Sequence, residues 1–497
     1  MTLAPPFILA IDQGTTSTRA ILFDSAARPV ASHSIELRQI YPANGWVEHD
    51  AEEIWQATLN CCRVAMKGVA AREIAAIGIT NQRETTVLWE RATGAALHNA
   101  IVWQDRRTAE RCRILKEDGC EPAVTARTGL LLDPYFSATK VEWLLDHIPG
   151  ARARAEQGEL AFGTIDSWLI FKLTGGEVHA TDVTNASRTM LLDLKRLAWD
   201  EEMLTLFRVP RAILPEVCDS AGDFGATSRD LFDAFIPIAG VAGDQQASAF
   251  GQACFRPGDV KSTYGTGCFA LVNTGAGVPV SQNRLLATSA YRAKGETAYA
   301  IEGSIFVAGA VVQWLRDAMG LIRSADEIEA LARTAKSAEG LYFVPAFTGL
   351  GAPYWDPEAR AAILGLTRDM GVAEIARAAL DAVCFQTRDL LDAMARDMTA
   401  ANLGAPGALK VDGGMVKNDW FCQRLADLTG LTVDRPKITE TTALGAAYLA
   451  GLSAGVFRDF SDISKAWALD RRFEPGLAKS ARDGLYDGWL KAVGRVR

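Results

Sequence analysis

A strand, a turn rich in glycine and threonine, and a second strand follow one another twice in this sequence, once in each half. The first unit runs from Phe7 to Phe23 around the turn DQGTTST at 12–18, and the second runs from Asp259 to Val272 around Gly265-Thr266-Gly267. A third glycine turn, Asp412-Gly413-Gly414, follows a short apolar segment and precedes a helical pattern. This recurrence predicts a duplicated architecture in which two related domains face a shared cleft.

Helical patterns such as Thr139 to His147 and Glu374 to Leu391 lie between the apolar, strand-like segments. Alternating strands and helices are typical of α/β layers. The chain has 497 residues, and a single hydrophobic core stops growing near about 250 to 300 residues. We therefore expect two α/β domains, 1–251 and 252–497, with the boundary near Gly251.

The charge balance, 52 Lys and Arg against 60 Asp and Glu, gives a formal net charge of −8. Such a chain lacks the long-range attraction of basic proteins to nucleic acids or anionic membranes, and we expect neither partner. The apolar run at the amino end stops at Asp12, too soon for a signal peptide or a membrane span. Nine cysteines without a CxxC pair, and five histidines without metal-ligand spacing, predict a cytoplasmic protein without structural zinc.

The first turn has the composition of an anion-binding site. Glycine lets the backbone approach a ligand, and neighbouring N–H groups and hydroxyls can bind phosphate. Ordinary hairpin turns use the same residues, so this turn alone leaves both interpretations open. Three such turns around one cleft favour a nucleoside triphosphate, although no GxxxxGK[ST] phosphate loop is present. Any metal would be a hard cation such as Mg²⁺, held by phosphates and carboxylates.

Polar residues follow apolar segments at two places where a strand end would face the cleft. Arg83 and Glu84 come shortly after Ile74 to Ile79 and could bind the hydroxyls of a polyol, or form a surface ion pair. Asp244 follows the largely apolar segment 237–243. A carboxylate there is a candidate general base, and a helix N-cap is the alternative.

Longer motifs run through the whole chain: DQGTTSTRAILFD at 12–24, TNQRETTVLWE at 80–90, NAIVWQDRRT at 99–108, GVAGDQQASAFGQ at 240–252, TYGTGCF at 263–269 and VDGGMVKN at 411–418. On these motifs the chain resembles the FGGY carbohydrate kinase family of the actin and hexokinase-like ATPase superfamily, in particular members that act on glycerol. The resemblance implies two actin/ribonuclease H-like domains facing a central cleft. It also implies phosphorylation of glycerol to sn-glycerol 3-phosphate by ATP with Mg²⁺, in a homo-oligomer, dimer or tetramer.

The resemblance further implies roles for individual residues. The glycerol pocket would consist of Arg83, Glu84, Trp103, Tyr135, Asp244, Gln245 and Phe269. The nucleotide contacts would be Thr15, Thr16, Ser17, Arg19, Thr266, Gly309, Gln313, Gly414 and Asn418. Asp244 would take the proton of the attacking hydroxyl, and the metal would lie at Asp12 and Asp244.

Two alternatives remain at this stage. One is an FGGY kinase for a pentulose or a larger polyol, for which the aromatic residues Trp103 and Phe269 would leave little room. The other is a non-kinase ATPase of the same superfamily, chaperone-like or filament-forming, which would not need Asp244 and the polyol-facing residues.

Overall fold

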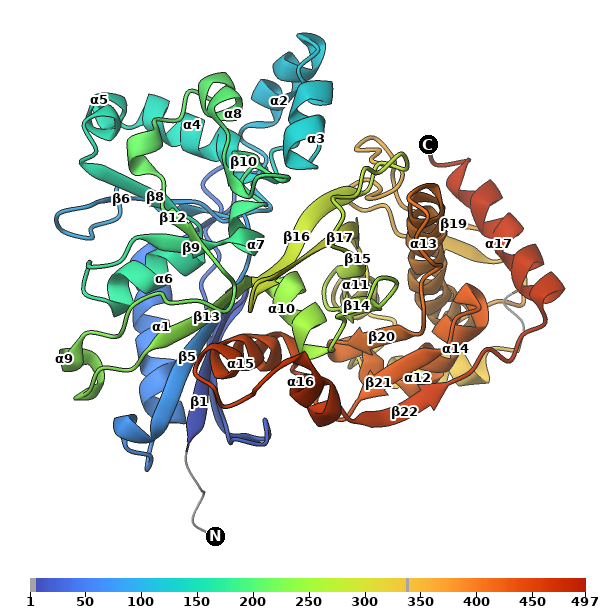
Figure 1. The fold of residues 1–497 in the computed structure, drawn as a ribbon. Helices are drawn as coiled ribbons and strands as arrows, with labels where there is room; N and C mark the ends of the chain where they lie inside the picture. Colours follow the sequence, from blue (N-terminus) through green and yellow to red (C-terminus); the bar gives the residue numbers. More distant parts are fainter. Residues whose placement is uncertain (1–5, 337–338) are drawn as a thin grey trace.

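The computed structural model describes residues 6–336 and 339–497, so residues 1–5 of the amino-end run lie outside it. Its two main sheets lie side by side, one built from each half of the chain (Figure 1). The five-stranded sheet has the order β13-β5-β1-β2-β3. Its strands are β1 (Phe7–Gln13), β2 (Ser17–Phe23), β3 (Pro29–Glu36), β5 (Ile74–Asn81) and β13 (Ile238–Gly243).

The seven-stranded sheet has the order β16-β17-β15-β14-β20-β21-β22. Its strands are β14 (Val260–Tyr264), β15 (Cys268–Gly275), β16 (Leu286–Ala293), β17 (Glu296–Ile305), β20 (Leu409–Asp412), β21 (Val433–Pro436) and β22 (Leu469–Phe473). The two sheets share a central arrangement, because β1 and β14 each pair with an antiparallel partner that follows in sequence, β2 or β15, and with a parallel partner, β5 or β20. The α/β fold class and the two strand–turn–strand units are therefore confirmed.

Helices surround both sheets, and several short strand pairs lie outside the main sheet of the first half. The helices of the first half are α1 (Ala51–Ala65), α2 (Ala109–Glu117), α3 (Glu121–Thr128), α4 (Ser137–His147), α5 (Ala151–Glu156), α6 (Ile165–Leu173), α7 (Val183–Ala186), α8 (Glu201–Leu206), α9 (Arg229–Phe232) and α10 (Asp244–Gly251). Its short strands are β4 (Glu48–His49), β6 (Val87–Glu90), β7 (Ala100–Ile101), β8 (Leu160–Gly163), β9 (Ala180–Asp182), β10 (Leu192–Asp193), β11 (Ala198–Trp199) and β12 (Glu216–Cys218). The second half adds α11 (Gly309–Asp317), α12 (Glu327–Thr334), α13 (Val372–Ala400), α14 (Asp419–Thr429), α15 (Thr441–Ser453), α16 (Phe460–Ala466), α17 (Lys479–Val493), β18 (Tyr342–Val344) and β19 (Ala362–Leu364).

Local sequence explains where these helices begin and what they bury. The predicted helical segments fall inside α4 and α13. Asp50 caps α1 by accepting N–H groups of the first turn, and Ile54 on its buried face is fully enclosed where α1 packs on β2 and β3. In the described residues, no helix combines the length and the apolarity that crossing a bilayer requires.

Helix α15 belongs to the second half of the chain but packs on β1, β5 and β13 of the first sheet and against α10 (Figure 1). Four glycines make this approach possible. A Cβ on Gly78 or Gly240 would overlap the backbone of α15, and a Cβ on Gly251 or Gly445 would overlap backbone where α10 meets α15. We call this contact the glycine seam. Because the second half reaches into the first here, the boundary near Gly251 stays a prediction.

Candidate active site

The predicted polyol residues Arg83, Glu84 and Asp244 come together at one edge of the first sheet. Strands β5 and β13 are parallel neighbours in which Asn81 pairs with Gly243, so the residues that follow both strands emerge at the same edge. Arg83 Nε lies 3.0 Å from Asp244 Oδ1. Glu84 has a φ of 60°, a left-handed conformation that strains a non-glycine residue and is typical of functional sites.

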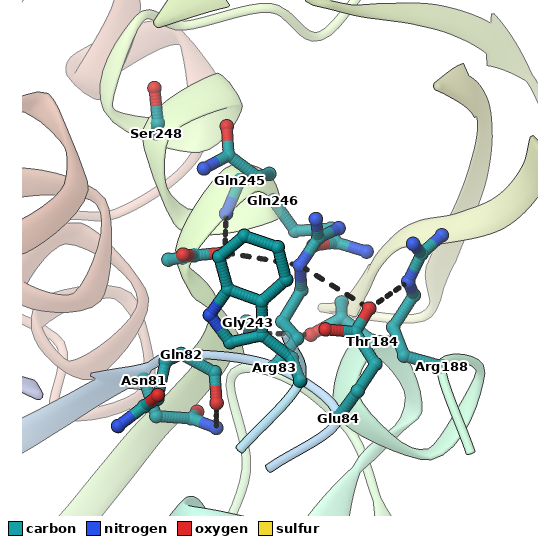
Figure 2. A network of polar contacts seen from close by, with 12 residues as sticks. Asn81, Gln82, Arg83, Glu84, Thr184, Arg188, Gly243, Gln245, Gln246 and Ser248 are labelled. Atoms are coloured by element: carbon teal, nitrogen blue, oxygen red, sulfur yellow. Dashed lines mark hydrogen bonds and ion pairs between the residues drawn. The ribbon is translucent and has the colours of Figure 1, made fainter. Parts of the chain in front are cut away.

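Four charged side chains, Arg83, Glu302, Arg188 and Glu84, form a ring of ion pairs behind this edge. The side chains of Arg83, Glu84 and Arg188 point toward one another (Figure 2). Arg83 donates from both Nη atoms to Glu302, at 2.5 and 3.1 Å. Arg188 donates to Glu84 Oε1 at 2.7 Å and to Glu302 Oε1 at 3.0 Å. All four side chains are at most 2% exposed. The alternative of a surface ion pair for Arg83 and Glu84 is therefore wrong.

Asp244 is joined to this network through Arg83 and is partly accessible to solvent, with 30% of its side chain exposed. Its Oδ1 accepts the N–H of Gln245 at 2.7 Å. Burial raises the pKa of Asp244, although Arg83 and Lys261 oppose the shift. The residue in the N-cap position of α10 is Gly243, and Asp244 is the first residue of the helix. This geometry does not support the N-cap alternative and leaves a carboxylate facing the open side of the site.

Three aromatic side chains border the same place. The ring of Trp103 lies 5.4 Å from that of Tyr135 and 6.1 Å from that of Phe269, between centroids. The guanidinium of Arg83 lies 6.0 Å from the Phe269 ring. Phe269 is on β15 of the second sheet, so both halves contribute to the polyol site. We call the set Arg83, Glu84, Asp244, Gln245 and these three aromatic residues the polyol pocket.

Sequence reasoning missed Arg188, Glu302 and Lys261. Lys261 lies on β14 and donates to Gln245 Oε1 at 2.5 Å. Burial lowers the pKa of Lys261, while nearby carboxylates, Asp244 among them, oppose that shift. A signal was available for Glu302, a charged residue that directly follows the apolar run 298–301 within its strand. Charges in such places are either paired or functional. Lys261 stands beside Ser262 and Thr263 in a largely polar strand and gave no such signal.

The first turn, between β1 and β2, is held from behind by amide side chains. Gln39 donates to the carbonyl oxygen of Thr15 at 2.9 Å, and Gln82 donates to that of Gly14 at 3.3 Å. Trp103 Nε1 donates to the Thr15 hydroxyl at 2.8 Å, which ties the turn to the polyol pocket. Of the remaining predicted residues here, Thr16 is exposed, Ser17 and Arg19 are half-buried, and Arg19 forms an ion pair with Glu440.

A cavity of about 520 Å³ opens on the second half, a size ordinary for small-molecule sites. Its lining includes five of the predicted nucleotide residues, together with apolar residues suited to a flat ring: Thr266, Gly309, Gln313, Gly414 and Asn418, with Val312, Ile328, Leu380, Met415 and Phe421. The start of α11 contributes N–H groups that favour anions. The four predicted residues of the first turn are not in this lining. The predicted nucleotide contacts therefore form two groups, one on each half.

Asp12, at the end of β1, has the character of a cation ligand. Burial raises its pKa to about 7, with Glu440 and Asp244 adding to the shift and Arg19 opposing it. No hydrogen bond to the Asp12 carboxylate is found within residues 6–336 and 339–497, and no cluster of three or more His, Cys, Asp or Glu that could hold a metal lies there. The carboxylates of Asp12 and Asp244 fit a hard cation such as Mg²⁺ that also binds phosphate.

Comparisons with known proteins agree along the whole chain. Residues 7–251 match the N-terminal domain and residues 260–454 the C-terminal domain of the FGGY family of carbohydrate kinases. The chain is 60% identical to the glycerol kinase of Alcanivorax borkumensis, over 99% of this chain and 98% of that protein, and 60% identical to glycerol kinase 1 of Pseudomonas aeruginosa, over 99% of each.

Solved structures also superpose on this chain over nearly its full length. The glycerol kinase of Plasmodium falciparum with ADP superposes with a TM-score of 0.92 at 37% identity, covering 99% of this chain and 98% of that one. The gluconate kinase of Lactobacillus acidophilus shares the fold, with a TM-score of 0.89 at 24% identity over 99% of this chain and 98% of that one. With the actin and hexokinase-like ATPase fold and both family domains in place, the chain belongs to the FGGY family of carbohydrate kinases.

Proposed function

We propose that this protein is a kinase that uses ATP to phosphorylate glycerol to sn-glycerol 3-phosphate. The observation that carries the proposal is the polyol pocket, in which one partly exposed carboxylate, Asp244, pairs with Arg83 of a buried charge network, and Arg83 in turn lies over the ring of Phe269. Full-length relatives at 60% identity that are glycerol kinases support the same acceptor.

The pocket suits a small polyol. Glycerol presents three hydroxyls and an apolar edge, so it needs converging donors and acceptors beside aromatic surfaces. We assign donation to Arg83, acceptance to Glu84 and Asp244, and the walls to Trp103 and Phe269. A pentulose would have to fit additional carbons beside these aromatic residues, which disfavours the first alternative. The non-kinase alternative loses its basis because the family is one of kinases.

Asp244 is proposed as the general base. It would accept the proton of the primary hydroxyl as that oxygen attacks the γ-phosphorus in line with the leaving oxygen. A carboxylate whose pKa is raised by burial is a stronger base than one in water. Asp12, with Asp244 beside it, would hold the Mg²⁺ that accompanies ATP and that offsets negative charge on the phosphates.

The nucleotide would bridge the two halves. Its adenosine end would occupy the cavity near Gly309, Gln313 and Asn418, and its phosphates would reach the first turn at Thr15, Thr16, Ser17 and Arg19. A triphosphate that contacts both halves favours their closure, which would exclude water and suppress hydrolysis. We further propose a cytoplasmic homo-oligomer, whose mass light scattering would measure.

The deciding experiment is an assay of ATP consumption with glycerol, dihydroxyacetone, xylulose, ribulose and gluconate. We expect glycerol to give by far the highest kcat/KM, because a wrong acceptor leaves buried polar groups unpaired. Equal efficiency with xylulose would contradict the proposed acceptor.

A further inference from the structure

We propose that Glu302 and Arg188 are positioning residues for the polyol: Glu302 orients Arg83, Arg188 orients Glu84, and the pocket is competent only when the second sheet holds Glu302 in place. This inference rests on the proposed function, since it concerns how the same pocket binds its acceptor. Neither residue is expected to touch the substrate.

The charge network connects the two halves of the chain. Arg83 follows β5 and Arg188 follows α7, both in the first half, whereas Glu302 lies within β17 of the second sheet. Glu302 accepts from both arginines, and Arg188 continues the chain of charges to Glu84. The four residues thus alternate in charge, and Glu302 is the one of them that the second half contributes.

Arg83 and Arg188 hold Glu302 in its carboxylate form. Burial alone would raise its pKa, but Arg188 and Arg83 more than offset that effect and hold the pKa of Glu302 at about 2. A fully buried carboxylate is destabilising unless it is paired. Loss of the charge on Glu302 would therefore leave two buried guanidinium groups without their shared partner.

The charge network leaves particular atoms of Glu84 and Arg83 available to a ligand. Arg188 engages Oε1 of Glu84, and among the described residues no donor reaches Oε2 of that side chain. Glu302 fixes both Nη atoms of Arg83, and the second hydrogen of Nη2 has only a long contact, 3.4 Å, to the Tyr135 hydroxyl. Oε2 of Glu84 is thus oriented and has no donor among the described residues, and one N–H group of Arg83 is engaged only by the long contact to Tyr135, as binding a hydroxyl requires.

The second sheet also links Glu302 to the aromatic residue Phe269. Strands β15 and β17 are antiparallel neighbours, with Leu271 opposite Glu302 and Phe269 opposite Ser304. Residues two apart on a strand share a face, and so do directly opposed residues, so Phe269 and Glu302 project from the same face of the second sheet. Any displacement of that sheet would move the wall and the anchor of Arg83 together.

The test is Glu302→Gln in the full-length protein, which keeps the size of the side chain and removes its charge. We expect the KM for glycerol, and its Kd by calorimetry, to rise at least tenfold, with the KM for ATP within twofold of wild type. Glu302→Asp should recover part of the glycerol affinity because it restores the carboxylate. A purely structural role would instead reduce the amount of active protein and leave both KM values unchanged.

Glu142→Gln is the matched control, because Glu142 is also a buried glutamate that accepts from two arginines, Arg111 and Arg208, at 2.9 Å each. It should change thermal stability without changing the KM for glycerol. If Glu302→Gln does not fold, Arg188→Lys takes its place, with an expected severalfold rise in the same KM.

The outcomes separate the two proposals. A wild-type protein that neither binds nor phosphorylates glycerol overturns the proposed function and this inference with it. A wild-type protein that is active on glycerol, beside a folded Glu302→Gln or Arg188→Lys variant with unchanged glycerol KM and Kd, overturns only the inference.

Discussion

The polyol pocket and the nucleotide cavity recognise their ligands by different means. The pocket is built from charged side chains that are held by other buried charges, such as Arg83 by Glu302. The cavity, at about 520 Å³, is bordered by glycine turns, a helix start and apolar side chains. The first arrangement fixes the directions of hydrogen bonds, and the second offers close backbone approach and surface area.

The two sites should therefore be sensitive to different kinds of substitution. A change of charge that preserves shape should damage the polyol pocket, and an added methyl group should damage the nucleotide cavity. Substitutions that respect this division should alter one KM and leave the other unchanged.

The largest expected effect is that of Asp244→Asn, which keeps shape but cannot take a proton. We expect kcat to fall by about 10² to 10⁴, the usual contribution of a general base, with little change in glycerol affinity or Tm. Initial rates and thermal melts measure this. Asp50→Asn, at the N-cap of α1, is the control, because asparagine caps a helix as well as aspartate does. A folded Asp244→Asn protein that retains more than roughly a tenth of the parental kcat would rule out the base.

The next effect belongs to the nucleotide side. A Cβ on Gly309 would lie 2.6 Å from the carbonyl oxygen of Gly265, so Gly309→Ala must displace a turn that lines the cavity. Overpacking of this kind costs about 1–3 kcal/mol, and we expect the KM for ATP to rise about tenfold while the KM for glycerol stays unchanged. Gly484→Ala on α17, where a Cβ meets no atom, controls for the added methyl group. A rise in both KM values would break the division between the two sites.

The smallest effect should fall on the contact between the polyol pocket and the first turn, whose residues are predicted to bind the phosphates. Trp103→Phe keeps an aromatic wall but removes the hydrogen bond to Thr15. A hydrogen bond of this type contributes about 0.5–1.5 kcal/mol, so kcat/KM should fall about two- to tenfold for glycerol and for ATP alike.

Trp199→Phe is the control for this bond, because it removes an indole hydrogen bond to Pro215, an interaction outside both sites. Its kinetics should match those of the parent protein. A Trp103→Phe variant that lost efficiency for glycerol alone would show that Thr15 does not transmit the change.

Much of this molecule could be predicted from local sequence. The glycine turns with their flanking apolar segments predicted the centre of each sheet, because short-range pairing forms these units. The meeting of Arg83 with Asp244 could be predicted as well, because both follow strands that end at the same edge. The roles of these residues in catalysis and binding stay predictions.

What local sequence could not supply is long-range pairing. Nothing near Glu302 in the chain indicates that it meets Arg83 and Arg188, which are far away in sequence. The packing of α15 on the sheet of the other half is a contact of the same kind. Such contacts depend on how whole helices and strands are arranged in space, and a short stretch of sequence does not determine that arrangement.

The glycine seam has a mechanical consequence. Helices normally interlock through ridges of side chains that settle into grooves, and relative movement then requires side chains to change rotamer. At Gly78, Gly240, Gly251 and Gly445 those ridges are missing, and backbone faces backbone. A contact of this kind leaves no gap that compression could close. Few side chains there would obstruct a sliding or tilting of α15 relative to the first sheet. The four positions that tolerate no added carbon are therefore also the positions at which side chains would least obstruct a relative movement of the two halves.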